Sequence, residues 1–251
     1  MNERIWTAGL VIIGDEILSG RTQDANLSNL AKWLNVQGIR LAEARVVADA
    51  TQAIVDAVNA LRATHDYVFT TGGIGPTHDD ITIDAVAQAF GVRVVVHPRA
   101  RAILTEYYAT RGGLNEGRLR MARVPEGAGL IENEATGAPG IRMGNVFVLA
   151  GVPRIALNML DALTGTLEGG KPMLSHTIGS MVAESEVAAT LLAMERAHPG
   201  CQIGSYPFFR DGTVGANFVI RSTDPHQLNL CAGALLEALR ANGWNPADGG
   251  I

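Results

Sequence analysis

Cysteine is almost absent from this chain, because only Cys201 and Cys231 occur among its 251 residues. Two cysteines cannot build a disulfide framework, which favours a reducing compartment such as the cytoplasm. No apolar run approaches the ~20 residues that span a bilayer, and residues 1–4 lead into a strand pattern rather than a signal peptide. Basic runs are also missing, and the net charge of −5 argues against a protein that grips nucleic-acid phosphates. We therefore expect a cytoplasmic protein that binds neither nucleic acid nor membrane.

Hydrophobic residues, by contrast, make up 47% of the chain, and charged residues make up 18%. A chain of this length and composition can bury a substantial core in one large domain or two small ones. Glycine is abundant, with 29 residues, which predicts many turns and places where the backbone approaches a neighbour closely.

The first two thirds of the chain alternate between strand and helix patterns. Apolar segments predict strands at residues 7–13, 39–47, 67–69, 92–96 and 145–150. Apolar residues at helical spacing predict helices at residues 24–38, 54–61, 79–90, 98–110 and 155–163. This alternation indicates an α/β fold with a mostly parallel sheet and right-handed crossovers. The charged residues of 39–47 place that strand at an outer position. Residues 112–144 are rich in turn signals, and we expect short strands and a short helix there.

A domain boundary is expected at residues 169–172, Gly-Gly-Lys-Pro, which divides the chain into domains 1–168 and 171–251. The second domain reads as strand, helix, two strands and helix (βαββα), a small α+β layer with a hairpin turn at Asp211-Gly212. Its apolar residues exceed what a small peripheral domain needs: Val187, Leu191, Leu192, Leu228, Leu235, Leu236 and Leu239. We therefore expect a homo-oligomer that buries part of this surface.

The most informative segment is 70–82, Thr-Thr-Gly-Gly-Ile-Gly-Pro-Thr-His-Asp-Asp-Ile-Thr, which joins a buried strand to a helix. Glycines let a backbone approach a phosphate, and a helix N-terminus offers free N–H groups and partial positive charge. Asp79 and Asp80 at the helix start would repel a phosphate unless a cation lay between them. Without thiol ligands, a hard ion such as Mg²⁺ is the simplest choice. The alternative is an ordinary turn with residues that start a helix well.

A second polar cluster follows the first strand, where Asp15 and Glu16 precede a helix that Asp24 can cap. Ligands bind at the carboxyl ends of parallel strands, so this cluster and segment 70–82 are expected at one sheet edge. Asp84 can join the same carboxylates. The alternative is that Glu16 is a solvated turn residue and Asp24 a plain cap. Six arginines between residues 99 and 123 form a solvated helix face or, as the alternative, neutralise a diphosphate.

These residues also carry a resemblance to a known family. The matching motifs, in order, are Gly14-Asp15-Glu16-Ile17-Leu18 with Gly20, Asp24 with Asn26, residues 70–82, Asn133 and Glu134 with Gly137-Ala138-Pro139-Gly140, and Gly151-Val152-Pro153. With them the chain resembles the MoaB/Mog molybdopterin-binding fold, and more closely the N-terminal part of the competence/damage-inducible protein CinA family. The resemblance is strong over residues 5–165 and looser over 170–251. One departure is Ala150-Gly151-Val152-Pro153-Arg154-Ile155, where the family has Pro-Gly-Val-Pro followed by Glu-Met, so no role transfers to Arg154 or Ile155.

The resemblance implies a three-layer α/β/α fold and a phosphate-bearing pterin or nucleotide ligand. It implies ligand-binding roles for Gly14, Asp15, Gly20, Asp24, Asn26, Thr71, Gly72, Gly73, Gly75, Pro76, Thr77, Thr82, Asn133, Gly137, Pro139, Gly140, Gly151 and Pro153. In the Mog relatives, the aspartate that matches Asp80 takes part in adenylylating molybdopterin. CinA-type relatives, and the similar domain attached to FAD synthases, are associated with metal-dependent hydrolysis of pyrophosphate bonds in ADP-ribose or FAD.

The leading hypothesis is therefore a divalent-metal-dependent hydrolase of a nucleotide pyrophosphate linkage. Asp80, Asp79 and Glu16 are its candidate catalytic residues, and Asp15, Asp79 and Asp80 are its candidate metal ligands. Two alternatives remain open from the sequence: a non-catalytic protein that binds molybdopterin or a nucleotide, and adenylyl transfer in molybdenum cofactor biosynthesis. All three functions need the same phosphate cradle.

Overall fold

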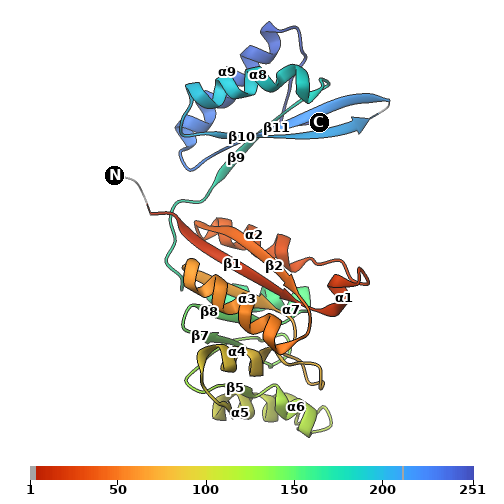
Figure 1. Ribbon diagram of the computed structural model, residues 1–251, viewed down its shortest axis with the longest axis vertical. Helices are drawn as coiled ribbons and strands as arrows, with labels where there is room; N and C mark the ends of the chain where they lie inside the picture. The colour runs from red at the N-terminus through yellow and green to blue at the C-terminus, as the bar shows by residue number, and fades with distance from the viewer. Residues whose placement is uncertain (1–3, 211) are drawn as a thin grey trace. The chain divides into compact units, whose positions relative to one another are not determined.

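The computed structural model describes residues 4–210 and 212–251, which fold as two compact units. The first unit ends at Gly170, and the second begins at Lys171 (Figure 1). Each unit encloses a buried apolar core of its own. No helix within the described residues has both the length and the hydropathy needed to cross a lipid bilayer.

The first unit is built on a six-stranded sheet in the order β2-β1-β3-β8-β7-β6. Its parallel strands are β2 (Ile39–Val47), β1 (Trp6–Ile13), β3 (Tyr67–Thr71) and β8 (Val146–Leu149). Strands β7 (Gly140–Met143) and β6 (Gly129–Ile131) continue the sheet in antiparallel fashion. The charged residues of β2 alternate with apolar ones, and this strand lies at the sheet edge, as its composition predicted.

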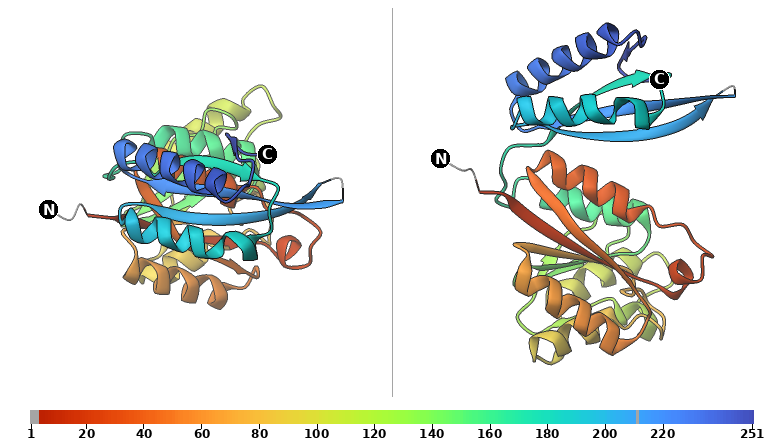
Figure 2. Two further views of the ribbon diagram at one scale, coloured as in Figure 1. Left: turned by 90° about the horizontal axis from the view of Figure 1, so that it is seen from above. Right: turned by 45° about the horizontal axis from the view of Figure 1, so that its top comes forward.

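Helices cover both faces of this sheet (Figure 2). They are α2 (Asn26–Val36) and α7 (Pro153–Leu163) on one face, and α3 (Thr51–Thr64) and α4 (Thr82–Phe90) on the other. In β1, Leu10 and Ile12 pack with the first pair, whereas Val11 and Ile13 pack with the second. Successive strand residues point to opposite faces, so an apolar strand must be covered on both sides. The predicted three-layer α/β/α fold is confirmed.

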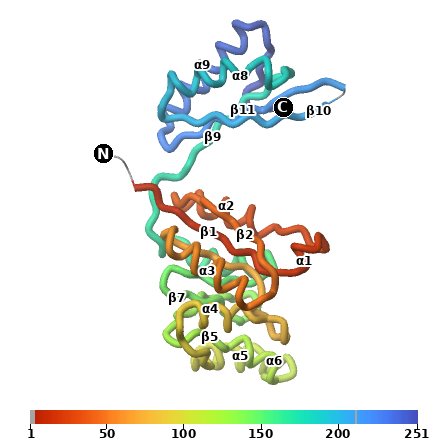
Figure 3. Tube along the Cα trace, in the orientation of Figure 1, coloured from red at the N-terminus to blue at the C-terminus, as the bar shows by residue number. Residues whose placement is uncertain are grey.

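The predicted position of residues 92–96 was wrong. Strand β4 (Val94–Val96) does not join the parallel sheet but pairs antiparallel with β5 (Arg123–Pro125) in a separate two-stranded sheet. None of its three valines is fully buried, so the run lacks the cover that a central parallel strand requires. The short sheet lies with α5 (Pro98–Tyr108) and α6 (Glu116–Arg120) at one end of the unit (Figure 3). The short elements expected between residues 112 and 144 are present as α6, β5, β6 and β7.

The second unit contains the predicted βαββα order and one further short strand. Its elements are β9 (Leu174–Ser180), α8 (Glu184–Ala197), β10 (Gln202–Arg210), β11 (Thr213–Ser222), α9 (Pro225–Ala241) and β12 (Ala247–Asp248). The sheet order is β10-β11-β9-β12, with every pair antiparallel. Asp211 of the predicted hairpin turn lies outside the described residues, while Arg210 pairs with Thr213 on either side of it.

The apolar side chains that led us to expect an oligomer pack mostly on the second unit's own core. Val187, Leu228, Leu235 and Leu239 are buried, and Leu191 and Leu236 pack against them. Only Leu192 of this set is exposed, at 49%. A homo-oligomer stays a prediction, to be measured by light scattering, but these side chains no longer supply its interface.

Candidate functional site

The polar clusters predicted from the sequence follow neighbouring strands at one edge of the sheet. Residues 14–20 follow β1, residues 72–81 follow β3, and residues 150–152 follow β8. The segments touch, because a Cβ atom placed on Gly72 would lie 2.2 Å from the carbonyl oxygen of Ile13. A Cβ atom on Gly151 would lie 3.2 Å from the Cα atom of Gly72. The carboxyl ends of β1, β3 and β8 therefore form one surface, which is where open α/β sheets bind ligands.

The turn after β3 requires glycine. Gly72 has a φ of 106° and Gly73 a φ of 66°, a region that other residues rarely adopt. Thr82, fully buried at the start of α4, fastens this turn: its hydroxyl donates to the Gly72 carbonyl at 2.9 Å, and its N–H donates to the Gly73 carbonyl at 3.0 Å. The turn is thus held in one conformation before any ligand arrives.

Free backbone donors follow that turn. The Gly72 N–H donates to the Leu149 carbonyl at 3.2 Å, so it belongs to the sheet rather than to a ligand. Within the described residues, the N–H groups of Gly73, Ile74 and Gly75 find no acceptor. Consecutive free N–H groups beside a helix start form an anion-binding concavity. The phosphate cradle at glycines 72, 73 and 75 stays a prediction, and these free donors would centre it on residues 73–75.

The helix start predicted at Asp79 was wrong, because α4 begins at Thr82. The Asp80 carboxylate accepts hydrogen bonds from the N–H and the hydroxyl of Thr77, at 2.8 and 2.6 Å. These local bonds hold residues 77–80 in a turn that competes with helix formation. Pro76 lies in this loop too, and a Cβ atom on Gly75 would lie 2.6 Å from the Asp80 carboxylate. Asp80 is thus folded back against Gly75.

Four carboxylates gather between the ends of β1, β2 and β3. Asp15 and Asp49 are linked reciprocally: the Asp15 N–H donates to Asp49 at 2.9 Å, and the Asp49 N–H donates to Asp15 at 3.3 Å. Burial raises the pKa of Asp49, and the negative charges of Asp15, Glu16 and Asp79 raise it further. Asp49 was missed in the sequence, although it follows the end of β2 as closely as Asp15 follows the end of β1.

The pKa of Asp49 predicts a pH effect on stability. A carboxyl whose pKa is raised in the fold binds its proton more tightly there than in the unfolded chain. Its destabilising contribution therefore grows as pH rises above the usual pKa of 3.8. Asp49→Asn keeps an acceptor for the Asp15 N–H and removes the charge, so its thermal midpoint should exceed wild type by about 1–3 °C at pH 7. The gain should vanish as pH falls below 3.8 in calorimetry. A variant less stable than wild type at pH 7 would contradict this electrostatic account.

These carboxylates do not enclose a metal site by themselves. Across residues 4–210 and 212–251, no group of three His, Cys, Asp or Glu side chains is placed to hold an ion. Asp84, considered as a further member, is instead paired with Arg123. A divalent metal held by these carboxylates stays a prediction.

Asn26 and two threonines leave polar atoms unsatisfied at this edge. Asn26 is 5% exposed and donates from Nδ2 to the Gly151 carbonyl at 2.7 Å, which ties α2 to the loop after β8. Its Oδ1 atom and the hydroxyl oxygens of Thr70 and Thr71 are buried without a partner among the described residues. Buried polar atoms without a partner are rare and point to water or a ligand that satisfies them.

Other predicted residues shape the backbone around this edge. Asp24 accepts from the Leu27 N–H at 2.7 Å and so caps α2, while Gly20 takes a positive φ of 71° after the short helix α1 (Asp15–Leu18). Gly14 donates its N–H to the Val47 carbonyl at 3.2 Å, and Pro153 opens α7 at its first position. Each of these four residues therefore has a structural role, and the ligand contacts that the resemblance implied for them stay a prediction.

The predicted residues 133–140 form a turn beside the cradle. The Asn133 amide donates to the Thr136 hydroxyl at 2.7 Å and to the Ala138 carbonyl at 2.8 Å, and its oxygen accepts from the Ala135 N–H at 3.1 Å. All of these bonds lie inside the turn, so Asn133 shapes it. A Cβ atom on Gly140 would lie 2.8 Å from the Val148 carbonyl, which explains glycine there.

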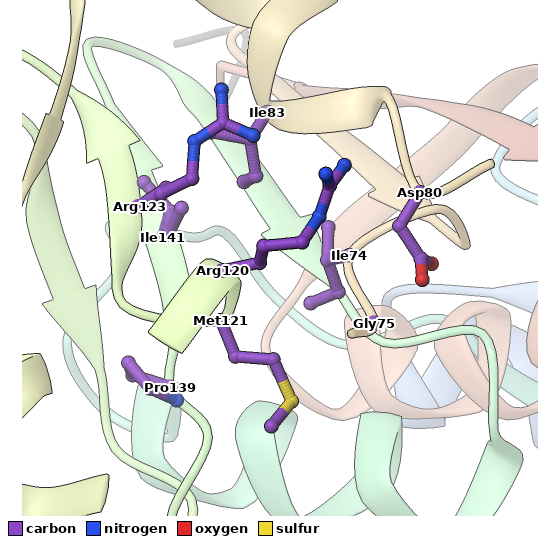
Figure 4. Close-up of a pocket in the computed structure, with 9 residues that line it drawn as sticks. All are labelled: Ile74, Gly75, Asp80, Ile83, Arg120, Met121, Arg123, Pro139 and Ile141. Atoms are coloured by element: carbon purple, nitrogen blue, oxygen red, sulfur yellow. The ribbon is translucent and has the colours of Figure 1, made fainter. Parts of the chain in front are cut away.

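A small hollow, the phosphate-side hollow, lies between the cradle and α6. It is lined by Ile74, Gly75, Asp80, Ile83, Arg120, Met121, Arg123, Pro139 and Ile141. Figure 4 shows that Arg120 and Arg123 extend their guanidinium groups toward the loop and helix that carry Asp80 and Ile83. Arg123 is paired with Asp84, whereas Arg120 has no ion-pair partner among the described residues. The sequence left two interpretations of Arg120 open, a solvated helix face and neutralisation of a diphosphate; in the structure Arg120 lines this hollow together with Ile74 and Gly75.

Comparison with known proteins agrees with this architecture. Residues 9–175 match the family described as a probable molybdopterin binding domain, and residues 172–248 match the middle domain of FAD synthase. A protein from Aeropyrum pernix is 34% identical over 214 residues, which cover 81% of this chain and 79% of that protein. A probable FAD synthase from Caenorhabditis briggsae is 30% identical over 258 residues, which cover 93% of this chain but only 49% of that protein. This chain thus spans about half the length of that relative.

Among solved structures, the protein CinA with unknown function from Thermoplasma acidophilum matches with a TM-score of 0.59 and 31% identity. The match covers 63% of this chain and 96% of that protein. The sequence matches and the shared fold lead to one assignment: the chain belongs to the family with the probable molybdopterin binding domain, joined to a unit that matches the middle domain of FAD synthase.

Proposed function

We propose that this protein binds a phosphorylated pterin or nucleotide at the carboxyl edge of its parallel sheet and hydrolyses a pyrophosphate bond of the ADP-ribose or FAD type. The observation that carries the proposal is the row of free N–H groups at Gly73, Ile74 and Gly75. Such a row binds a phosphate without any side chain, and the rigid turn before it limits the entropy lost on binding. The family match and the similarity to a probable FAD synthase support a ligand of this class.

The carboxylates are assigned to the reacting end of the ligand. Asp80 is held beside the cradle by Thr77, at a place where it can orient a water molecule toward a bound phosphoryl group. Asp15, Glu16 and Asp79 lie across the same edge. A divalent cation, when bound, would neutralise phosphoryl charge. One or two of these carboxylates would hold it, and they would exclude a phosphate that came without it.

A binding protein without catalysis is the second candidate. The observation that favours it is that no three carboxylates in the described part of the chain are placed to grip one metal ion. Adenylyl transfer needs the same cradle and also a nucleoside triphosphate.

A turnover screen separates these functions. Purified protein is incubated with ADP-ribose, FAD and NAD, each with Mg²⁺, Mn²⁺ or Co²⁺, and AMP release is followed by chromatography. Release of AMP that stops on addition of EDTA supports the hydrolase. Calorimetric binding without AMP release supports the binding protein. In a parallel incubation with ATP and molybdopterin, incorporation of AMP into the pterin supports adenylyl transfer. The absence of both binding and turnover for all ligands would overturn the proposal.

Arg120 gives a direct test of the anion-binding part. An uncommitted guanidinium that meets a phosphate contributes about 1.5–3 kcal/mol, so Arg120→Ala should weaken binding of ADP-ribose by roughly tenfold to a hundredfold in calorimetry. Arg101→Ala is the matched control, because Arg101 is exposed on α5 and does not line this hollow. If both variants bind ADP-ribose with equal affinity, Arg120 does not contact the ligand.

A further inference from the structure

The two cysteines of the chain meet in the core of the second unit. Cys201 directly precedes β10 and Cys231 lies in α9, and both are buried. The Cys201 thiol donates to the Gln227 carbonyl at 3.4 Å. Gln227 lies one helical turn before Cys231, and side chains on a helix lean toward its N-terminus. The Cys231 sulfur therefore lies over the same helical turn that the Cys201 sulfur contacts, and the two sulfurs are neighbours.

The backbone on both sides of this pair is anchored. The Cys201 N–H donates to the His198 carbonyl at 2.8 Å, which fixes the turn before β10. The buried Ser222 hydroxyl donates to the Gly200 carbonyl at 2.8 Å and ties the same turn to the end of β11. On the other side, the Asp224 carboxylate accepts from two N–H groups of the first turn of α9 and caps that helix. The fold itself thus brings the two thiols together.

The surroundings of the pair do not suit other thiol chemistry. Burial, with a further contribution from the adjacent Cys201 thiol, raises the pKa of Cys231 to about 12. A buried thiol of this kind is a poor nucleophile, so the pair does not fit covalent catalysis. A metal site would need more ligands, and the described residues place no three His, Cys, Asp or Glu side chains around one ion. The reaction that remains for two adjacent thiols is a disulfide between them.

We propose that Cys201 and Cys231 form a reversible disulfide that locks the second unit when the surrounding pool of small thiols becomes oxidised. The crosslink joins the turn before β10 to α9 and encloses β10 and β11 in one covalent loop. Such a loop removes conformational freedom from the unfolded chain and so stabilises the fold. In a reducing compartment, a disulfide of this kind is transient and senses the redox state.

The oxidant is a low-molecular-weight disulfide such as glutathione disulfide. Cys201, 5% exposed, is the cysteine nearer to solvent, and its thiolate attacks one sulfur of the oxidant. This attack releases one glutathione thiolate, which takes up the proton that Cys201 lost. The Cys231 thiolate then attacks the Cys201 sulfur of the mixed disulfide and releases the second glutathione, which takes up the Cys231 proton. Two protein thiols are thereby oxidised to one disulfide, and the small disulfide is reduced to two thiols.

Burial makes this exchange slow in both directions. Cys231 is fully buried and its raised pKa leaves little thiolate, so the second attack needs a transient opening of the unit. A reductant needs the same opening to reach the finished disulfide. The lock therefore responds to sustained changes of the thiol pool and not to brief ones.

The test equilibrates the full chain in reduced or in oxidised glutathione, with and without urea that opens the second unit, and then dilutes the urea. Alkylation and mass spectrometry count the free thiols. The reduced sample should hold both thiols, whereas the oxidised sample should lose the mass of two hydrogen atoms and yield a peptide pair that joins Cys201 to Cys231. Hydrogen exchange in β10, β11 and α9 should slow by roughly tenfold or more in the crosslinked chain. Exchange in α2 and α3 of the first unit should stay unchanged.

Cys231→Ala is the matched control, because it keeps the more accessible thiol and removes its partner. It should take up at most one glutathione, and its hydrogen exchange should not slow in the oxidised buffer. Two free thiols in wild type after dilution from urea into oxidised glutathione would overturn the proposal, since the sulfurs would then not meet in the fold. Crosslinks between chains, seen as a doubled mass on a non-reducing gel, would overturn it as well. A disulfide within the chain that leaves hydrogen exchange unchanged would overturn the lock.

Discussion

Asp80→Asn should lower turnover of the pyrophosphate substrate at least a hundredfold and leave the protein folded. The asparagine side chain keeps an oxygen that accepts from the Thr77 N–H and hydroxyl, so the turn at residues 77–80 persists. The negative charge is lost, and with it the ability to orient and deprotonate a water beside the cradle; removal of a general base costs about 10²–10⁴-fold. Turnover is measured as AMP released per enzyme, together with the thermal midpoint.

The matched control is Asp161→Asn, the same chemical change at an exposed position near the end of α7. It should retain wild-type turnover and midpoint. Asp80→Asn turnover within threefold of wild type would exclude Asp80 from the chemistry. A large fall in the midpoint of Asp80→Asn would instead assign this residue to the fold.

Gly73→Ala should destabilise the first unit by about 3 kcal/mol or more, a large share of typical stability. Part of the cost is a non-glycine residue at a φ of 66°, about 1–2 kcal/mol. The remainder comes from contact, because the new Cβ atom would lie 2.2 Å from the Thr82 hydroxyl oxygen, which is fully buried and bonded to Gly72. The free energy of unfolding is measured in urea by tryptophan fluorescence.

Gly91 provides the matched control, since it ends α4 with a φ of 67° and a Cβ atom there would meet nothing within 4 Å. Gly91→Ala should lower the free energy of unfolding only by the cost of placing alanine at a positive φ. The difference between the two variants therefore reports the contact with Thr82. Equal costs for both would mean that the turn relaxes away from Thr82, and the cradle would then not be rigid.

Much of the cradle was predictable because it depends on local sequence. A buried strand, consecutive glycines and a following helix place residues 72–82 at a sheet edge whatever the rest of the chain does. The predicted start of α4 was wrong by three residues. Helix propensity predicted a first helical turn at Asp79, but the hydrogen bonds from Thr77 to Asp80 hold a non-helical turn there. Side-chain hydrogen bonds of this kind produce no periodic pattern in the sequence.

Local pattern could not find Asp49, nor could it single out Arg120 among six arginines, because the positions of both residues depend on pairing between distant segments. Asp49 reaches the site since β2 lies beside β1, with Val47 opposite Ile13. Arg120 reaches it through β5, which directly follows α6 and pairs with β4. The sequence predicted neither that pairing nor the separate sheet that it forms. Turn-rich segments with short elements have little periodicity, so most of the residues that line the phosphate-side hollow could not be inferred from the sequence.

The place of β8 in the sheet also determines when the carboxyl edge of the sheet is completed during synthesis. β8 lies beside β3, with Val68 paired to Val146, although all of α4 to β7 lies between them in the chain. A nascent chain that has emerged only to Phe90 already contains β1, β2, β3 and α4. Its Gly72 N–H still lacks the Leu149 carbonyl, and its Asn26 amide lacks the Gly151 carbonyl. Closure of so long a loop costs entropy before any contact repays it. This edge of the sheet is therefore completed only after β8 has emerged, and partly synthesised chains expose a bare strand β3 that needs protection from other nascent chains.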